Sequence, residues 1–283
     1  MLAQGPRGAL VARLDAFIAR HRFTISVTFP VVGAILLIAS AQGLLTGAWA
    51  WLSFSPWLIL LGTLVMRSPL LAGLMGALDR RAVVGLLVVS AYAYTIEAIG
   101  LATGWPYGAF SYGVALGPTL AGVPLALPLF FIPLVLNAYL LSLVLLGARA
   151  RRTSWRLGAS LALVLCIDLV LDPGAVALGF WRYDGGGLYH GVPWTNFAGW
   201  VLSGSVALLV LDRTLDRGRL IERSEACPFM LDDMVSFVLL WGSVNAWAGN
   251  WVPVFTAALL GLCLWRTGRY PLAGRRPHRV ARA

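Results

Sequence analysis

The sequence of 283 residues contains no lysine, only three histidines and only three cysteines. The few histidines exclude the membrane di-iron hydroxylases, desaturases and ketolases, because imidazole is the usual neutral ligand of such iron. Cys166, Cys227 and Cys263 stand far apart, so neither a disulfide framework nor a metal-binding spacing is present. A GxGxxG, a P-loop and a CxxCH motif are also missing, which leaves nucleotide, flavin and haem sites without support. We therefore expect chemistry without metal or cofactor, carried by carboxyl groups, aromatic rings and water.

Charge is scarce, and hydrophobic runs are long. Charged residues make up 12% of the sequence and hydrophobic residues 59%. A soluble domain carries about 25% charged residues, so much of the surface is expected to face lipid. Runs long enough for a spanning helix of about 20 residues lie at 24–45, 49–66, 82–101, 124–146, 157–178, 197–211, 231–247 and 251–265. The sequence thus predicts an all-α, polytopic membrane bundle of about eight transmembrane helices.

The basic residues predict the orientation of this bundle. All 22 are arginines, and the formal net charge is +10. Every arginine except Arg182 falls on one side of the predicted spans, so the positive-inside rule places both termini in the cytoplasm. No nucleic-acid partner is needed to explain the charge. We divide the chain into a cytoplasmic amphipathic segment (1–23), a transmembrane bundle (24–265) and a basic cytoplasmic tail (266–283), with the lipid bilayer of the cell (plasma) membrane around the bundle.

Two long loops on the opposite side, 102–123 and 179–195, are rich in glycine and aromatic residues and nearly free of charge. Non-helical backbone at that depth survives only where it is buried in protein or lines a cavity. We therefore expect both loops to pack as caps over the bundle. Aromatic faces stabilise a desolvated cation by about 2 kcal/mol, so the loops favour a site that handles a carbocation.

Three carboxyl groups, on Glu97, Asp168 and Asp172, lie inside predicted spans. Asp168 and Asp172 are four residues apart and share one helix face. No arginine is predicted inside a span to pair with them, and burial without a cation disfavours the ionised form. They are candidate proton donors; the alternative is that they are polar contacts between helices. Asp232 and Asp233 begin a predicted span, where acids cap a helix N-terminus, and are expected to be structural.

Two segments resemble a known family. They are EAIGLATGWPYGAFSY (97–112) and DLVLDPGAVALGFWRYDGGGLYHGVPWTNFAGW (168–200). Both are similar to the integral-membrane carotenoid 1′,2′-hydratases of the CruF type, which are related to the hydratases that finish bacterioruberin-like pigments in haloarchaea. The resemblance is strong from the third to the sixth predicted helix. Trp105 stands where the family pattern leads us to expect Phe, a departure that affects shape more than chemistry.

The resemblance implies a cofactor-independent hydro-lyase that adds water to the terminal double bond of an acyclic carotenoid end and forms a tertiary alcohol. The implied substrate is of the lycopene or γ-carotene type, and the resemblance allows association with other carotenoid enzymes. Asp168 or Asp172 is our candidate acid, and Glu97 the candidate partner that orients water. The candidate substrate-binding residues are Tyr107, Tyr112, Trp181, Tyr183, Asn196 and Trp200.

Two other functions remain open at this point. The segment DLVLD (168–172) is similar to the aspartate-rich diphosphate motif of UbiA-like membrane prenyltransferases. Such sites bind Mg²⁺ with several clustered carboxylates, however, and a second aspartate-rich motif is missing. Buried carboxyl groups also serve as proton relays in proton-coupled transporters, but the sequence shows no inverted repeat.

Overall fold

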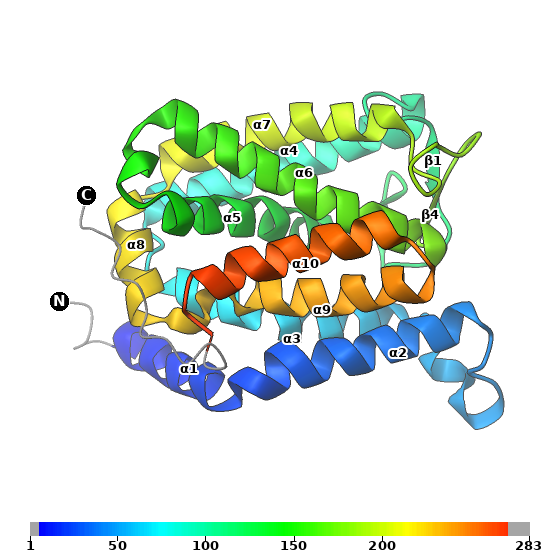
Figure 1. Cartoon of the computed structure of the whole chain (residues 1–283), viewed down its shortest axis with the longest axis horizontal. Helices are drawn as coiled ribbons and strands as arrows, with labels where there is room; N and C mark the ends of the chain where they lie inside the picture. The colour runs from blue at the N-terminus through cyan, green and yellow to red at the C-terminus, as the bar shows by residue number, and fades with distance from the viewer. Residues whose placement is uncertain (1–5, 271–283) are drawn as a thin grey trace.

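The computed structural model describes residues 6–270, which form a bundle of helices that run roughly side by side (Figure 1). The helices are α1 (Pro6–Phe23), α2 (Phe29–Ala41), α3 (Pro56–Met75), α4 (Arg80–Thr103), α5 (Leu127–Leu146), α6 (Thr153–Ala177), α7 (Trp194–Thr214), α8 (Arg217–Ala226), α9 (Asp232–Trp247) and α10 (Trp251–Arg266). Short helical turns of other pitch are η1 (Thr24–Thr28), η2 (Gly47–Leu52), η3 (Gly147–Arg151) and η4 (Pro228–Leu231).

Within residues 6–270, seven helical segments are long and apolar enough to cross a membrane, and α10 is a shorter apolar helix. The first segment joins α1, η1 and α2 into one stretch, Gly8–Ala41. Large apolar side chains such as Leu87 and Phe255 are more than 60% exposed on these helices, as expected where a surface faces lipid (64% and 67%). The chain is therefore an integral membrane protein, while its orientation and its division into three parts stay predictions.

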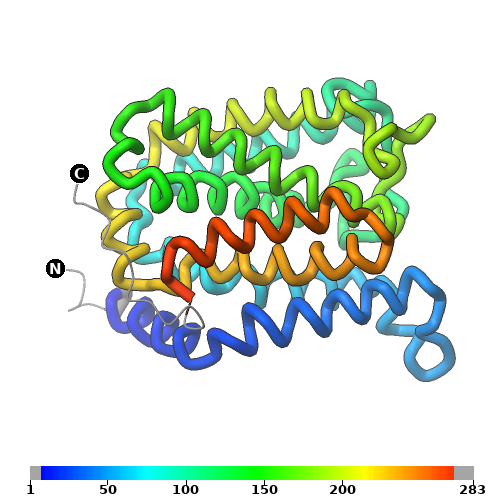
Figure 2. Tube along the Cα trace, viewed as in Figure 1, coloured from blue at the N-terminus to red at the C-terminus, as the bar shows by residue number. Residues whose placement is uncertain are grey.

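The two ends of the bundle differ in character. The start of α1, η3 and α8 lie at one end, which we call the arginine end, and the strands β1 and β4 lie at the other, which we call the capped end (Figures 1 and 2). Helix α5 packs against α4, α6 and α7. Its residues from Phe131 to Leu143 are buried with one exception, Ile132. The core of the bundle therefore lies along this helix.

At the capped end, the two long loops pair with each other. Strand β1 (Phe110–Tyr112) runs antiparallel to β4 (Trp181–Tyr183), and β2 (Thr119–Leu120) runs antiparallel to β3 (Val123–Pro124). In the first pair Phe110 faces Tyr183 and Tyr112 faces Trp181. The expectation that these loops form caps, made from their aromatic and glycine content, is confirmed.

At the arginine end, aspartates and arginines form ion pairs. Arg67 pairs with Asp233 at 2.6 Å, and Arg156 pairs with Asp212 at 2.5 Å. The expectation that no arginine lies inside a span is wrong, because α3 continues through Arg67 to Met75. Asp233 is also more than a helix cap. An arginine is tolerated at this depth because a buried carboxylate neutralises it and binds its N–H groups.

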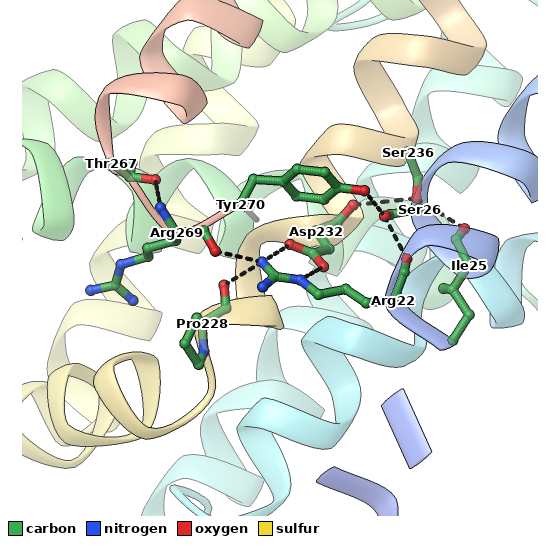
Figure 3. A network of polar contacts seen from close by, with 9 residues as sticks. All are labelled: Arg22, Ile25, Ser26, Pro228, Asp232, Ser236, Thr267, Arg269 and Tyr270. Atoms are coloured by element: carbon green, nitrogen blue, oxygen red, sulfur yellow. Dashed lines mark hydrogen bonds and ion pairs between the residues drawn. The ribbon is translucent and has the colours of Figure 1, made fainter. Parts of the chain in front are cut away.

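A further polar network fastens the N-terminal helix to the other end of the chain (Figure 3). The guanidinium of Arg22 binds the Asp232 carboxylate, the Pro228 carbonyl at 3.1 Å and the Arg269 carbonyl at 2.7 Å. The hydroxyl groups of Ser26 and Tyr270 lie 2.9 Å apart. The beginning of the predicted basic tail is thus packed against the bundle, and its residues 271–283 lie outside the described part of the chain.

Candidate active site

A cavity of about 250 Å³ lies inside the bundle and extends to the capped end. Helices α2, α3, α5 and α9 contribute most of its wall, which is largely apolar, and the strands β1 and β4 contribute aromatic residues. The lining residues run from Ser55, directly before α3, to Arg67 on that helix. Those twelve steps correspond to about 18 Å at 1.5 Å rise per residue. The cavity is therefore elongated along the helices, a shape that suits a long apolar chain.

Eight of the nine residues singled out in the sequence border this cavity. They are Glu97, Tyr107, Tyr112, Asp172, Trp181, Tyr183, Asn196 and Trp200. Asp168 is not part of the wall and lies behind Asp172, one helical turn closer to the arginine end. The fold thus brings together residues from α4, α6, α7 and the two loops around one space.

The two aspartates share a single amide. The Asn196 side chain donates to the Asp172 carboxyl and, at 3.2 Å, to Oδ2 of Asp168. Both carboxyl groups are buried, at 1% and 3% exposure for Asp168 and Asp172. Oδ1 of Asp168 has no hydrogen-bond partner among the described residues. Across residues 6–270, no arginine or histidine forms an ion pair with Asp168, Asp172 or Glu97. The amide donor brings the two carboxyl groups together without neutralising them.

Pro173 explains a second contact to this part of α6. Proline has no N–H, so the carbonyl four residues earlier, on Leu169, lacks its helical partner. The Tyr189 hydroxyl donates to that carbonyl at 3.1 Å. Burial raises the pKa of Tyr189 to about 12, so its hydroxyl keeps its proton and stays a donor. Helix α6 therefore continues to Ala177, and the second loop is fastened to the helix that carries both aspartates.

The pairing of β1 and β4 brings one tyrosine from each strand into hydrogen-bond contact with a cavity acid. Side chains alternate between the two faces of a strand, so Tyr112 and Tyr183 point to the bundle while Ser111 and Arg182 are exposed. Tyr112 donates to Glu97 at 2.5 Å, and Tyr183 donates to Asp172 at 3.2 Å. Burial raises the pKa of both phenols, which therefore stay neutral. Glu97 and Asp172 therefore each receive one phenol hydrogen bond.

Aromatic rings cover the cavity wall between these acids. The ring of Tyr107 lies against Gly100 of α4 and Gly199 of α7, where a Cβ atom would collide with it or press closely on it. Trp200 stacks on Phe131, with ring centroids 5.3 Å apart and 12° between the planes. Phe131 escaped notice in the sequence because it lies inside an apolar span of ordinary composition. The close packing of helices and loops makes this wall rigid.

The opposite part of the cavity wall holds polar residues that sequence reasoning missed as site residues. Arg67 and Asp233 both border the cavity. The guanidinium Nη1 of Arg67 donates to Oδ1 of Asp233, and Asn137 donates to Oδ2 at 2.5 Å. The available signal was an arginine inside the apolar run 56–75, which we placed in a loop because we ended the span at Met66, nine residues before α3 ends.

Comparisons with known proteins agree with this picture. A family profile described as "Carotenoid biosynthesis protein" matches residues 54–264. The chain is 57% identical over 260 residues to bisanhydrobacterioruberin hydratase of Haloarcula japonica. The aligned region covers 92% of this chain and 87% of that protein. No solved structure matches the chain significantly. These comparisons support neither the prenyltransferase nor the transporter alternative.

Proposed function

The chain belongs to the carotenoid biosynthesis protein family, and on that premise we propose that it is a carotenoid hydratase. The enzyme adds water across the terminal 1′,2′ double bond of an acyclic carotenoid end and forms a tertiary alcohol. One observation carries the mechanism: two buried carboxyl groups share the Asn196 amide beside an apolar cavity, without an ion-pair partner in residues 6–270. The likeness to a hydratase over most of the chain supports the reaction class.

Asp172 is the acid of this reaction. Two carboxyl groups that share one site titrate as a pair and hold a proton between them. Asp172 borders the cavity and Asp168 does not, so Asp172 faces the substrate and Asp168 supports it from behind. Transfer of the proton to the less substituted alkene carbon leaves a tertiary carbocation on the other carbon. The aromatic rings of Tyr107, Tyr183 and Trp200 stabilise that cation through their negative faces.

Glu97 orients the water that completes the addition. It borders the same cavity and is held by Tyr112 from the first loop. The water oxygen forms the new C–O bond, and the proton that it releases passes to Glu97 as general base. Return of that proton to the aspartate pair through water restores the starting state, so the sum of the steps is the addition of one water molecule. No metal or redox cofactor takes part.

The test is to supply the purified protein in detergent with lycopene or γ-carotene in ¹⁸O-labelled water, without oxygen and with a chelator present. We expect a product heavier by one labelled water molecule, identified by mass spectrometry. An unlabelled hydroxyl group, or activity that requires oxygen or added metal, contradicts the proposal. The same assay with allylic diphosphates measures the prenyltransferase alternative, for which we expect no product.

We also propose that both termini of the chain lie in the cytoplasm, because Arg182 is the one arginine on the other side of the predicted spans. Reporter fusions after Arg81, Arg152 and Arg219 are expected to report cytoplasm. Fusions within 113–122 and 185–191 are expected to report the outside. Opposite signals at two adjacent sites contradict this orientation.

A further inference from the structure

The part of α6 that carries Asp172 is also held from the side that faces α9. The amide of Asn245, on α9, donates to the Val170 carbonyl of α6 at 2.8 Å and to the Trp241 carbonyl of its own helix at 2.8 Å. Asn245 is fully buried and does not border the cavity. A buried amide that binds the backbone of a neighbouring helix ties the two helices together.

Asn250 extends this contact along α6. It directly precedes α10 and donates to Oδ1 of Asn245 at 3.0 Å and to the Pro173 carbonyl at 3.4 Å. We call Asn245 and Asn250 the asparagine clasp. On the same stretch of α6, the Leu169 carbonyl accepts from the Tyr189 hydroxyl of the second loop. Side chains from outside the helix therefore bind carbonyls both before and after Asp172.

The asparagine clasp and the aspartate pair lie on opposite faces of α6. Val170 is two residues from both Asp168 and Asp172, and two residues correspond to about 200° around a helix. The stretch that carries the acids is thus held between two buried asparagines. Asn196 of α7 binds the carboxyl groups on one face, and Asn245 binds the backbone from the other.

Pro173 makes this stretch of α6 dependent on outside contacts. Proline has no N–H, so it removes one helical hydrogen bond and tends to bend the helix. Helix α6 nevertheless continues to Ala177. Gly174 lets α9 approach closely, because a Cβ atom there would lie 2.9 Å from the Trp241 ring and 3.1 Å from Nδ2 of Asn245. The asparagine clasp therefore fixes α6 at the point where a proline helix is easily bent.

We propose that Asn245 is a positioning residue for the hydration reaction and holds the Asp172 carboxyl group at the cavity through the backbone of α6. Asp172 accepts from Asn196 and Tyr183, which belong to α7 and β4. A rotation or shift of α6 changes the distance to both donors and to the substrate. Misplacement of a reacting group by about 1 Å lowers a rate by up to about a hundredfold. The inference rests on the proposed function for the role of Asp172 as the acid.

The first measurement is the turnover of Asn245→Ala, which removes the amide and adds no atoms. Purified protein in detergent is supplied with lycopene or γ-carotene, and the pigments are quantified by mass analysis. We expect kcat per folded molecule to fall by about tenfold or more. KM should change little, because Asn245 does not border the cavity.

The second measurement is the infrared C=O stretching band of the aspartate pair, identified by its loss when Asp168 and Asp172 are both replaced by asparagine. A carboxyl C=O group that accepts weaker hydrogen bonds vibrates at higher frequency. We expect the band to move to higher frequency in Asn245→Ala, because the donors on α7 and β4 no longer meet the carboxyl groups in the native geometry. A side chain that only adds stability would leave this band in place.

Ser160→Ala is the matched control. The hydroxyl groups of Ser142 and Ser160 lie 2.7 Å apart, are buried and join α5 to α6, eight residues before Asp168. The variant removes a polar contact between α6 and another helix at a point away from the acids. It is expected to leave kcat, KM and the infrared band unchanged.

Asn250→Ala is the second variant if Asn245→Ala does not fold. It removes the donor to the Pro173 carbonyl and to Asn245 Oδ1, and it leaves the Asn245 amide on the Val170 carbonyl. We expect a several-fold lower kcat and a smaller shift of the band in the same direction. Wild-type values of both quantities in this variant would then overturn the inference.

Wild-type kcat with an unmoved band in Asn245→Ala overturns the inference and leaves the asparagine clasp as a contact that only holds helices together. An equal loss of kcat in Ser160→Ala also overturns it, since any weakening of the packing of α6 would then slow the reaction. Failure of the proposed function looks different. In that case wild type forms no hydrated carotenoid, while the band still moves in Asn245→Ala and not in Ser160→Ala.

Discussion

The two ends of the bundle use the same residue type, a buried carboxyl group, in opposite ways. At the arginine end, Asp212, Asp232 and Asp233 each bind an arginine. At the capped end, Asp172 and Glu97 accept hydrogen bonds from tyrosine hydroxyl groups and one amide, and neither pairs with an arginine within residues 6–270. An arginine holds its aspartate ionised and in one place, whereas neutral donors leave a carboxyl group free to take up and release a proton. Burial alone therefore does not identify a reactive acid; its partners do.

The largest effect is expected from Asp172→Asn. Asparagine is nearly isosteric with aspartate but has no acidic proton, so turnover should fall by about 10² or more. Pigment conversion normalised to folded protein in the membrane measures this effect. Asp168→Asn should be less harmful, because Asp168 does not border the cavity. Glu97→Gln should also impair turnover if Glu97 orients water. Wild-type conversion by both Asp172→Asn and Asp168→Asn would contradict a role of this pair in the reaction. The two aspartates would then have only a structural role, as the aspartates at the arginine end do.

A large effect is also expected from filling the cavity between its two ends. Gly62 lines the wall, and a Cβ atom there meets nothing within 4 Å. The Gly62→Phe side chain should occupy the substrate space and misplace the reacting bond, which lowers turnover by about tenfold to a hundredfold. Gly158→Phe is the control, because Gly158 is exposed and also has open space. Equal turnover of the two variants would show that the substrate does not use this cavity.

Removal of one phenol should have a smaller effect. Tyr112→Phe deletes the hydrogen bond to Glu97 and keeps the ring, and a single hydrogen bond contributes about 1 kcal/mol. We expect turnover to fall several-fold, with most of the loss in kcat because Glu97 is less well oriented. Tyr94→Phe is a control in which a hydroxyl group that binds the carbonyls of Leu120 and Val123 is lost from the capped end. A loss in Tyr94→Phe as large as in Tyr112→Phe would assign both tyrosines to loop packing.

The smallest effect on turnover per folded molecule is expected at the arginine end. Arg156→Met leaves the half-buried Asp212 carboxylate without its cation, which costs up to about 3 kcal/mol of folding free energy. The amount of folded protein and its Tm should fall, while each folded molecule keeps its activity. The second change Asp212→Leu should restore part of the stability. A variant that folds normally but turns over slowly would contradict the structural role that the comparison assigns to this pair.

Much of the fold could be predicted from sequence because its signals are local. Apolar runs marked the helices, and the aromatic, glycine-rich loops marked the caps. Alternation in FSY and WRY could have indicated which side chains of β1 and β4 face inwards. The spacing of Asp168 and Asp172 likewise placed both carboxyl groups on one helix face. The end of α3 was missed because Arg67 looked like the boundary of a span, and its partner Asp233 is far away in sequence.

The sequence by itself determined a membrane bundle of helices, two packed loops and a short set of acids without nearby cations, because hydropathy and helical spacing act over a few residues. Only the tertiary structure decided which acids meet arginines, that Asn196 joins Asp168 to Asp172, and that Asp172 rather than Asp168 borders the cavity. Those contacts join residues distant along the chain. They depend on how whole helices are rotated against each other, and in an apolar environment the packing of many side chains sets that rotation.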